Sequence, residues 1–383
     1  AHPPIYMPEN CNLEDVEHIR NFVDIPVVCA GRLDPRVAAD AIAEGKLDGA
    51  GFARQFLADQ AWVTKMMEGR EEDIRPCILC HNGCFNMCHY KGVPNDQDLS
   101  DSLHLSRCAV NAETMQWKKH YIQPAAVSRR VHIIGGGIGG MEAARVLKLR
   151  GHKPVIHEKG SQLGGTFIAA SAESYKGKLR QLLAWYRRQM EQMEIEVHLN
   201  EEISGTEQFG SDPVIIATGA VPRLPKNVPG YERMIEACDY LNGAEVGETV
   251  AVIGGGLTGC EIAYELALQG KKPVIVEMKD DLIAQKGVCL ANSSYLREWF
   301  ALHKIPVYLE TTLKEVGEKA IVCRGKDGTE TEIPCDSVIS SIGYIPNPLR
   351  AKGKNVYLIG DCDKVGNLRT VIWSAYEAAM KIK

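Results

Sequence analysis

The sequence has little of what would tie the chain to a membrane or to nucleic acid. No apolar run approaches the roughly 18 residues that a membrane-spanning helix needs. The first residues, AHPPIYMPEN, lack the charged-then-apolar pattern of a signal peptide. Lysine and arginine form no basic run and the net charge is −5, so nothing favours a nucleic-acid or membrane partner. We expect a cytoplasmic protein, and whether it forms a homo-oligomer stays open.

A disulfide scaffold is also not expected. The chain has 13 cysteines, an odd number, and no export signal that would take them to an oxidising compartment. Cys29, Cys238, Cys260 and Cys323 lie in apolar or mixed stretches and are expected to be inert core thiols. The stretch RPCILCHNGCFNMC (75–88) needs another explanation, because such closely spaced cysteines form a bridged knot, a zinc site or an iron–sulfur site.

Glycine is plentiful, and two stretches use it in the same way. Residues 131–159 read as an apolar strand, a G-x-G-x-x-G turn at Gly135, Gly137 and Gly140, a helix, and a second strand ending in Glu158. In such a unit the glycines allow a tight turn, close approach of a pyrophosphate, and close helix–strand packing. The helix N-terminus then offers free N–H groups to the phosphates, and the carboxylate can accept from ribose hydroxyls.

The second stretch, residues 250–280, repeats this design. Its glycines are Gly254, Gly256 and Gly259, and the carboxylate is Glu277. In both units the acidic residue lies 18 positions after the last glycine. Two copies in register predict two dinucleotide-binding units.

Two further strands complete a recognisable set. PVIIATGAVPR (213–223) ends near A-T-G, and YLIGDCD (357–363) ends in Gly-Asp. Together the four segments resemble the flavoprotein reductases with two dinucleotide folds, in the disulfide-reductase style. The resemblance implies FAD bound by Gly135, Gly137, Gly140, Glu158 and Asp361, and a nicotinamide cofactor bound by Gly254, Gly256, Gly259 and Glu277. The carboxylate of Glu277 would repel a 2′-phosphate, so NADH is favoured over NADPH, although Lys279 nearby weakens that preference.

The redox cysteine pair of the disulfide reductases is missing. Neither 160–171 nor 238–241 holds a C-x₄-C or C-x-x-C pair. Electrons from a flavin therefore need another route, and the cysteine cluster is the candidate.

The cluster reads Cys77-x₂-Cys80-x₃-Cys84-x₃-Cys88, followed later by Cys108 in RCAVN. Soft thiolates suit both zinc and iron–sulfur centres. Zinc sites usually contain two C-x-x-C knuckles, and only one is present here. His81 and His89 lie nearby but form no pair at knuckle spacing. Spacing alone favours iron–sulfur and leaves zinc, or thiols that bind nothing, as alternatives.

RPCILCHNGC followed by CAVN resembles the iron–sulfur segment of the 2,4-dienoyl-CoA reductase and 2-enoate reductase group, relatives of Old Yellow Enzyme that include trimethylamine dehydrogenase. The resemblance implies a [4Fe–4S] cluster on Cys77, Cys80, Cys84 and Cys108. The gap from Cys84 to Cys108 holds 23 residues, more than the dozen of that group, so Cys88 competes for the fourth position.

The first 76 residues resemble the last two strand–helix units of the Old Yellow Enzyme barrel. IPVVCAGRLDP (25–35) and LDGAGFARQFLAD (47–59) flank a helix, and the resemblance places an FMN phosphate on Arg32 and Arg54. A barrel needs eight strands, and these residues supply two. Since the chain also starts without Met, we expect either a fragment of a longer protein or a vestigial barrel. FMN is expected only in an intact barrel.

The sequence thus predicts an α/β protein with two Rossmann-like domains, preceded by an iron–sulfur segment and two units of a TIM barrel. The expected domains are 1–76 (barrel remnant), 77–125 (iron–sulfur segment), 126–222 with 341–383 (FAD), and 223–340 (NAD). The resemblance implies an NADH-dependent oxidoreductase that passes electrons from NADH through FAD and [4Fe–4S] to FMN, reducing an activated C=C bond of a small enoate or enoyl thioester. A diaphorase-like electron-transfer module and a zinc-stabilised nucleotide-binding module are the alternatives. Trp373 is expected to be a core residue, and no catalytic side chain is identified.

Overall fold

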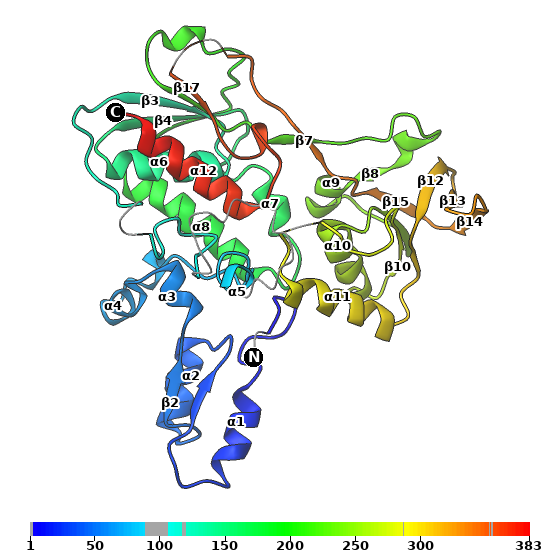
Figure 1. The fold of residues 1–383 in the computed structure, drawn as a ribbon, viewed down its shortest axis with the longest axis horizontal. Coiled ribbons are helices and arrows are strands. Elements are labelled where there is room, and N and C mark those ends of the chain that lie inside the picture. The colour runs from blue at the N-terminus through cyan, green and yellow to red at the C-terminus, as the bar shows by residue number, and fades with distance from the viewer. Residues whose placement is uncertain (1–2, 89–105, 117–119, 286, 352, 354) are drawn as a thin grey trace.

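The computed structural model describes residues 3–88, 106–116, 120–285, 287–351, 353 and 355–383. The described part of the chain contains two parallel sheets, a small antiparallel sheet, a two-stranded link and a strand pair near the N-terminus (Figure 1). The α/β fold class expected from the sequence is confirmed. None of the described helices is long and apolar enough to cross a membrane.

The first parallel sheet carries the first Gly-rich unit. Its elements are β3 Arg130–Ile134, α6 Ile138–Leu149, β4 Lys153–Glu158, α7 Phe167–Ala170, α8 Gly177–Gln192, β5 Glu196–Leu199, η2 Glu207–Phe209, β6 Val214–Ile216, β17 Val356–Leu358, η4 Gly360–Cys362 and α12 Leu368–Lys381. The strands run in the order β17-β6-β3-β4-β5, all parallel. Because a parallel pair needs a crossover, α6 returns the chain from β3 to β4. Helix α12, from the far end of the chain, packs along α6 (Figure 1).

The second parallel sheet repeats this arrangement. Its elements are η3 Tyr231–Arg233, β8 Ile235–Glu236, α9 Ala237–Leu241, β9 Thr249–Ile253, α10 Leu257–Leu268, β10 Lys272–Val276, α11 Leu290–Leu302, β11 Val307–Tyr308 and β15 Ser337–Ser340. The strand order is β11-β10-β9-β15-β8, again all parallel. An antiparallel sheet of β12 Thr311–Val316, β13 Ala320–Gly325 and β14 Glu330–Pro334 covers one face of it and shares an apolar core with it.

Two antiparallel strands, β7 Ala220–Pro222 and β16 Tyr344–Pro346, join the two halves. Each lies where the chain passes from one parallel sheet to the other. They therefore lie at the two crossings that the sequence placed near residues 222 and 341, and the domain limits themselves stay a prediction.

The N-terminal segment contains a small strand–helix–strand unit. It contains α1 Leu13–Arg20, β1 Val28–Ala30, α2 Pro35–Ala43, β2 Gly49–Gly51, α3 Arg54–Ala58, α4 Trp62–Met67 and η1 Glu71–Asp73, and α5 Phe85–Cys88 follows. Strands β1 and β2 pair in parallel across α2, whose N-cap Asp34 accepts from two backbone N–H groups. Elements α1, α2 and β2 of this segment extend away from the rest of the molecule (Figure 1), whereas η1 contacts α8. Phe22, Ile25 and Val28 are 74%, 68% and 60% exposed, so this unit leaves an apolar edge uncovered.

The expected core thiols divide into two kinds. Cys29, Cys260 and Cys323 are fully buried in apolar clusters, as expected. Cys238 is only half-buried, and its sulfur lies 3.1 Å from the Tyr344 hydroxyl.

The stability of the first unit depends on the apolar faces of α6. We expect Leu147→Ala to lower the free energy of unfolding by about 2–5 kcal/mol, because Leu147 is fully buried and truncation leaves a cavity. Leu149→Ala on the same helix is the control, since Leu149 is 44% exposed. Urea denaturation of both variants measures the difference, and equal losses would contradict the packing described here.

Candidate cofactor sites

In the first Gly-rich loop, the backbone is closely packed at Gly135 and Gly140, and free space remains only at Gly137. Gly135 has φ +111°, and a Cβ there would lie 2.4 Å from the Ala217 carbonyl oxygen. A Cβ at Gly140 would lie 2.0 Å from the Gly135 carbonyl oxygen. Gly137, the N-cap of α6, has no atom within 4 Å of its Cβ position. The loop is therefore tightly packed except where a phosphate would approach the helix N-terminus.

Glu158 is held beside this loop by two backbone groups. Its carboxylate oxygens accept from the N–H groups of Gly136 and Gly160, each at 2.6 Å. These bonds fix the carboxylate at the end of β4, next to the turn. A nucleotide with its phosphates at α6 would bring its ribose to this end of the strand.

The second loop has the same construction. Gly254 has φ +107°, and a Cβ at Gly259 would lie 1.9 Å from the Gly254 carbonyl oxygen. The Cβ position of Gly256 is 3.4 Å from Gln285, the nearest side chain. Glu277 accepts from the N–H groups of Gly255 at 2.6 Å and Lys279 at 2.8 Å. The two carboxylates thus take equivalent positions in the two units.

Asp361 lies in η4, directly before α12. It accepts from the N–H of Gly366 at 3.0 Å, and burial raises the pKa of its carboxyl group. In the first turn of α12, Val371 lies 3.1 Å from the Cβ position of Gly139, which is in the first turn of α6 directly after the first Gly-rich loop. The start of α12, Asp361 and the first Gly-rich loop therefore meet at one edge of the first sheet.

The four cysteines Cys77, Cys80, Cys84 and Cys108 line one small cavity, together with Arg54 and His81. Within the described part of the chain, no three His, Cys, Asp or Glu side chains come close enough together to hold a single metal ion. A zinc ion needs its thiolate sulfurs about 2.3 Å away, all converging on one point. An iron–sulfur cluster takes one thiolate on each of four irons and so needs the sulfurs spread around a larger centre. The donor set fits a cluster better than a single ion.

Burial and the backbone around the cavity act in opposite directions on the four thiols. Burial raises the pKa of all four thiols, to about 12 for Cys80 and about 11 for Cys84. Opposing this, backbone N–H groups lower each thiol pKa: Leu79 for Cys77, Asn82 for Cys80, Phe85 for Cys84 and Val110 for Cys108. N–H groups directed at sulfur are typical of iron–sulfur sites, where they tune the centre.

The thiol cavity forms where the loop from Cys77 to Cys84 closely approaches residues 107–110. A Cβ at Gly83 would lie 2.7 Å from the Ala109 nitrogen and 2.8 Å from the Cys108 carbonyl carbon, so only glycine fits there. Leu79 and His81 take left-handed φ values of 58° and 55°, which curl the loop around the thiols. Such strain in residues other than glycine is typical of sites where the surrounding structure dictates the backbone.

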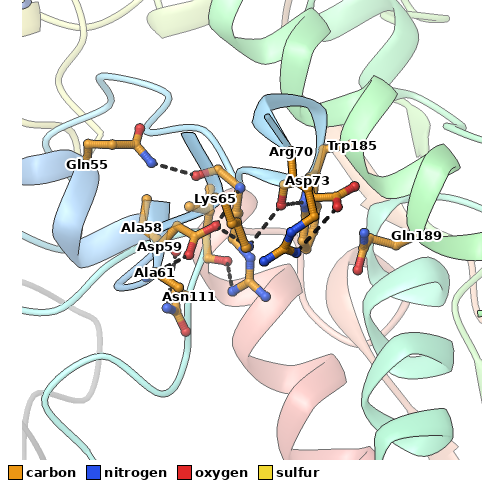
Figure 2. A network of polar contacts seen from close by, with 12 residues as sticks. Gln55, Ala58, Asp59, Ala61, Lys65, Arg70, Asp73, Asn111, Trp185 and Gln189 are labelled. Atoms are coloured by element: carbon orange, nitrogen blue, oxygen red, sulfur yellow. Dashed lines mark hydrogen bonds and ion pairs between the residues drawn. The ribbon is translucent and has the colours of Figure 1, made fainter. Parts of the chain in front are cut away.

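A polar network anchors both segments to α3 and α8 (Figure 2). Gln55 accepts from the Cys77 N–H at 2.9 Å and donates to the Arg75 carbonyl at 2.9 Å. Asp59 accepts from the Arg75 N–H and binds Lys65 at 2.6 Å, and Asn111 donates to the Ala58 carbonyl at 3.2 Å. The Trp185 indole of α8 donates to the Asp73 carbonyl at 3.0 Å. The cysteine segments are thus fixed to the first dinucleotide unit.

Helix α12 also reaches the thiol cavity. The Trp373 indole N–H donates to the Cys108 carbonyl at 3.0 Å. The Arg107 and Arg369 guanidinium carbons lie 4.0 and 5.0 Å from the Trp373 ring centre, and Arg369 donates to the Met87 sulfur at 2.9 Å. Trp373 was expected to be a core residue rather than a cofactor contact: it is half-buried, packs against the core of the first unit, and also contacts the cysteine segment. The same helix therefore contacts the first Gly-rich loop and the thiol cavity.

The two arginines expected to bind a phosphate have partners within the protein. Arg32 donates to the carbonyls of Pro4 at 2.5 Å and Ile5 at 2.9 Å. The Arg54 guanidinium lies 2.6 Å from the His81 ring and lines the thiol cavity. Their role at an FMN phosphate stays a prediction. The Cys88 side chain and the loop GVPNDQDLSDS lie outside the described residues.

Sequence reasoning missed Gly83, Gln55 and Arg369. Gly83 stands within the cysteine cluster itself, in H-N-G-C, and that position was the available signal. Gln55 and Arg369 lie far from the cysteines along the chain and carry no motif.

Comparison with known proteins agrees with this geometry. Over 392 aligned residues the chain is 36% identical to cinnamate reductase of Clostridium sporogenes, covering 100% of this chain and 57% of that protein. It is 32% identical to NADH oxidase of Thermoanaerobacter brockii, covering 96% of this chain and 57% of that protein. The structure of 2-naphthoyl-CoA reductase superposes with a TM-score of 0.83 at 26% identity, covering 100% of this chain and 58% of the other. The chain spans less than two thirds of the length of these relatives.

These matches confirm the resemblance to the 2,4-dienoyl-CoA reductase and 2-enoate reductase group. Residues 129–358, which contain both Gly-rich units, match the pyridine nucleotide-disulphide oxidoreductase family. The chain therefore belongs to this family of flavoprotein oxidoreductases, which bind FAD and NAD(P)H.

Proposed function

We propose that this chain is the NADH-oxidising and electron-transferring part of a flavin and iron–sulfur reductase. FAD would bind the first loop and Asp361, NADH the second loop, and a [4Fe–4S] cluster Cys77, Cys80, Cys84 and Cys108. These groups supply hydride transfer between NADH and FAD, and then single-electron transfer through the cluster to FMN, for reduction of an activated C=C bond. The observation that carries the proposal is the cavity of four thiols beside the helix that contacts the first loop.

The chain's own residues provide placement rather than chemistry. The N–H groups at the start of α6 and α10 would hold the two pyrophosphates, while Glu158 and Glu277, each fixed by two N–H groups, would orient the riboses. The negative charge of Glu277 favours NADH over NADPH. Backbone N–H groups around the four cysteines would favour negative charge on the sulfurs of the bound cluster and partly offset the effect of burial.

The proposal that FMN in a barrel reduces the substrate depends on the N-terminal unit. Parallel pairing of β1 with β2 across α2, and its uncovered apolar edge, fit two units of an eight-stranded barrel. Within an intact barrel, Arg32 and Arg54 would turn to an FMN phosphate. The names of the relatives, a cinnamate reductase and a 2-naphthoyl-CoA reductase, support an enoate or enoyl-thioester substrate.

A diaphorase-like module is the second candidate, because both dinucleotide units and the thiol cavity lie within this chain. Anaerobic assays test what the two candidates share, NADH oxidation by this chain and no enoate reduction without a barrel. We expect the chain alone to oxidise NADH with ferricyanide as acceptor and to leave an enoate such as cinnamate unreduced. A protein with bound FAD that fails to oxidise NADH would contradict the proposal, and enoate reduction by this chain alone would contradict the role assigned to an intact barrel.

Gly137→Ala is expected to lower FAD content without unfolding the protein. The added Cβ meets no protein atom and φ is −71°, but it occupies the space through which a pyrophosphate would approach α6. Bound flavin after purification and urea denaturation of the flavin-free protein are measured. Gly177→Ala, where the Cβ meets only an Arg180 nitrogen at 3.8 Å, is the control. Full FAD content in Gly137→Ala would place the flavin elsewhere.

Cys108→Ser and Cys88→Ser decide the fourth cluster ligand. We expect Cys108→Ser to lose most of the bound iron and the absorbance near 400 nm, because Cys108 lines the cavity with the other three thiols. Cys88→Ser should keep both. The opposite pattern, measured by iron assay of anaerobically purified protein, would assign the position to Cys88.

Glu277→Gln is expected to reduce the preference for NADH over NADPH by about tenfold, since removing one close repulsive charge is worth roughly 1–2 kcal/mol. Glutamine can still accept from the Gly255 N–H, so the loop keeps its shape. The ratio of kcat/KM for the two cofactors is measured. Glu158→Gln, the equivalent change in the first unit, should leave this ratio unchanged, and a shift there instead would exchange the two assigned sites.

A further inference from the structure

Arg369 is a buried cation without an anionic partner among the described residues. Its side chain is 2% exposed, and it lies in the first turn of α12. One guanidinium nitrogen donates to the neutral sulfur of Met87, and Nε has no acceptor within the described chain. No carboxylate of the described residues forms an ion pair with it. A buried charge without an anionic partner is costly, so a partner other than the described side chains is expected.

The surroundings of Arg369 point to where that partner would lie. Burial and the nearby Arg107 lower its pKa to about 10, while Cys80 opposes this shift. At neutral pH the guanidinium therefore keeps its positive charge. The group that favours this charge, Cys80, belongs to the thiol cavity, and a [4Fe–4S] centre with four thiolates is an anion.

Trp373 fixes this arrangement. Its ring is contacted by Arg369, and its indole N–H is bonded to the Cys108 carbonyl. Arg369 therefore cannot move away from the thiols without breaking the packing of α12 against the cysteine segment. Its charge is held in place rather than mobile.

We propose that Arg369 raises the reduction potential of the cluster held by the four cysteines. This inference rests on the proposed function. Reduction adds one electron, delivered from the flavin, and so increases the negative charge of the centre by one. A fixed buried cation stabilises the reduced form more than the oxidised form, which makes the centre a better electron acceptor.

The test compares variants of Arg369 that lack or keep its positive charge. Arg369→Gln removes the charge, and Arg369→Lys keeps it. Arg150→Gln is the matched control, because Arg150 is also a buried arginine but binds the Ala379 and Ile382 carbonyls at the other end of α12. Iron content and absorbance are measured first, and the midpoint potential is then obtained by an anaerobic titration followed by electron paramagnetic resonance.

For Arg369→Gln we expect about a tenfold lower equilibrium constant for one-electron reduction, equivalent to about 59 mV. Arg369→Lys should recover most of this, and Arg150→Gln should match the unmodified chain. An unchanged potential in Arg369→Gln with full iron would overturn the inference and leave the proposed function intact. Loss of the cluster in both Arg369 variants would overturn it too, because shape and not charge would then be decisive. An unmodified chain without iron would instead refute the proposed function.

Discussion

The close approach of residues 107–110 to the loop from Cys77 to Cys84 is the contact on which the thiol cavity depends. Gly83 permits it, since any side chain there would collide with the backbone at Cys108 and Ala109. The Arg107 N–H, bonded to the Gly83 carbonyl at 2.6 Å, then holds the two segments together. Without this contact three thiols would lie in one loop, and the fourth would have no fixed place.

The same contact sets the position of the cavity in the molecule. Gln55, Asp59 and Asn111 tie the cysteine segments to α3, and Trp373 ties them to α12. A second buried network connects the two dinucleotide units: Lys176 binds Glu261 at 2.8 Å, and the Tyr6 hydroxyl donates to the same carboxylate at 3.0 Å. Both sets of contacts are largely buried, so they are shielded from salt and limit relative movement of the units.

The Gly-rich units were predictable because their constraints are local. The glycines, the helix and the closing carboxylate lie within one stretch of chain, and the first and third glycines of each unit meet a close backbone contact, either inside that stretch or at the end of a neighbouring strand of the sheet. The grouping of Cys77, Cys80 and Cys84 was predictable from spacing, whereas Cys108 needed a family resemblance. The roles of Trp373 and Arg369 could not be foreseen, because α12 meets the cysteine segment more than 250 residues away in sequence. The partners of Arg32 could not be predicted either, because Pro4 and Ile5 belong to no recognisable sequence motif.

The central claim is that the four thiols hold an iron–sulfur cluster next to a flavin. A visible spectrum of anaerobically purified chain, with iron, zinc and flavin assays on the same sample, tests it most directly. The account predicts about four irons and one FAD per chain, with a broad absorbance near 400 nm that NADH bleaches. Zinc without iron, and no flavin, would contradict it and leave a nucleotide-binding module stabilised by a metal ion.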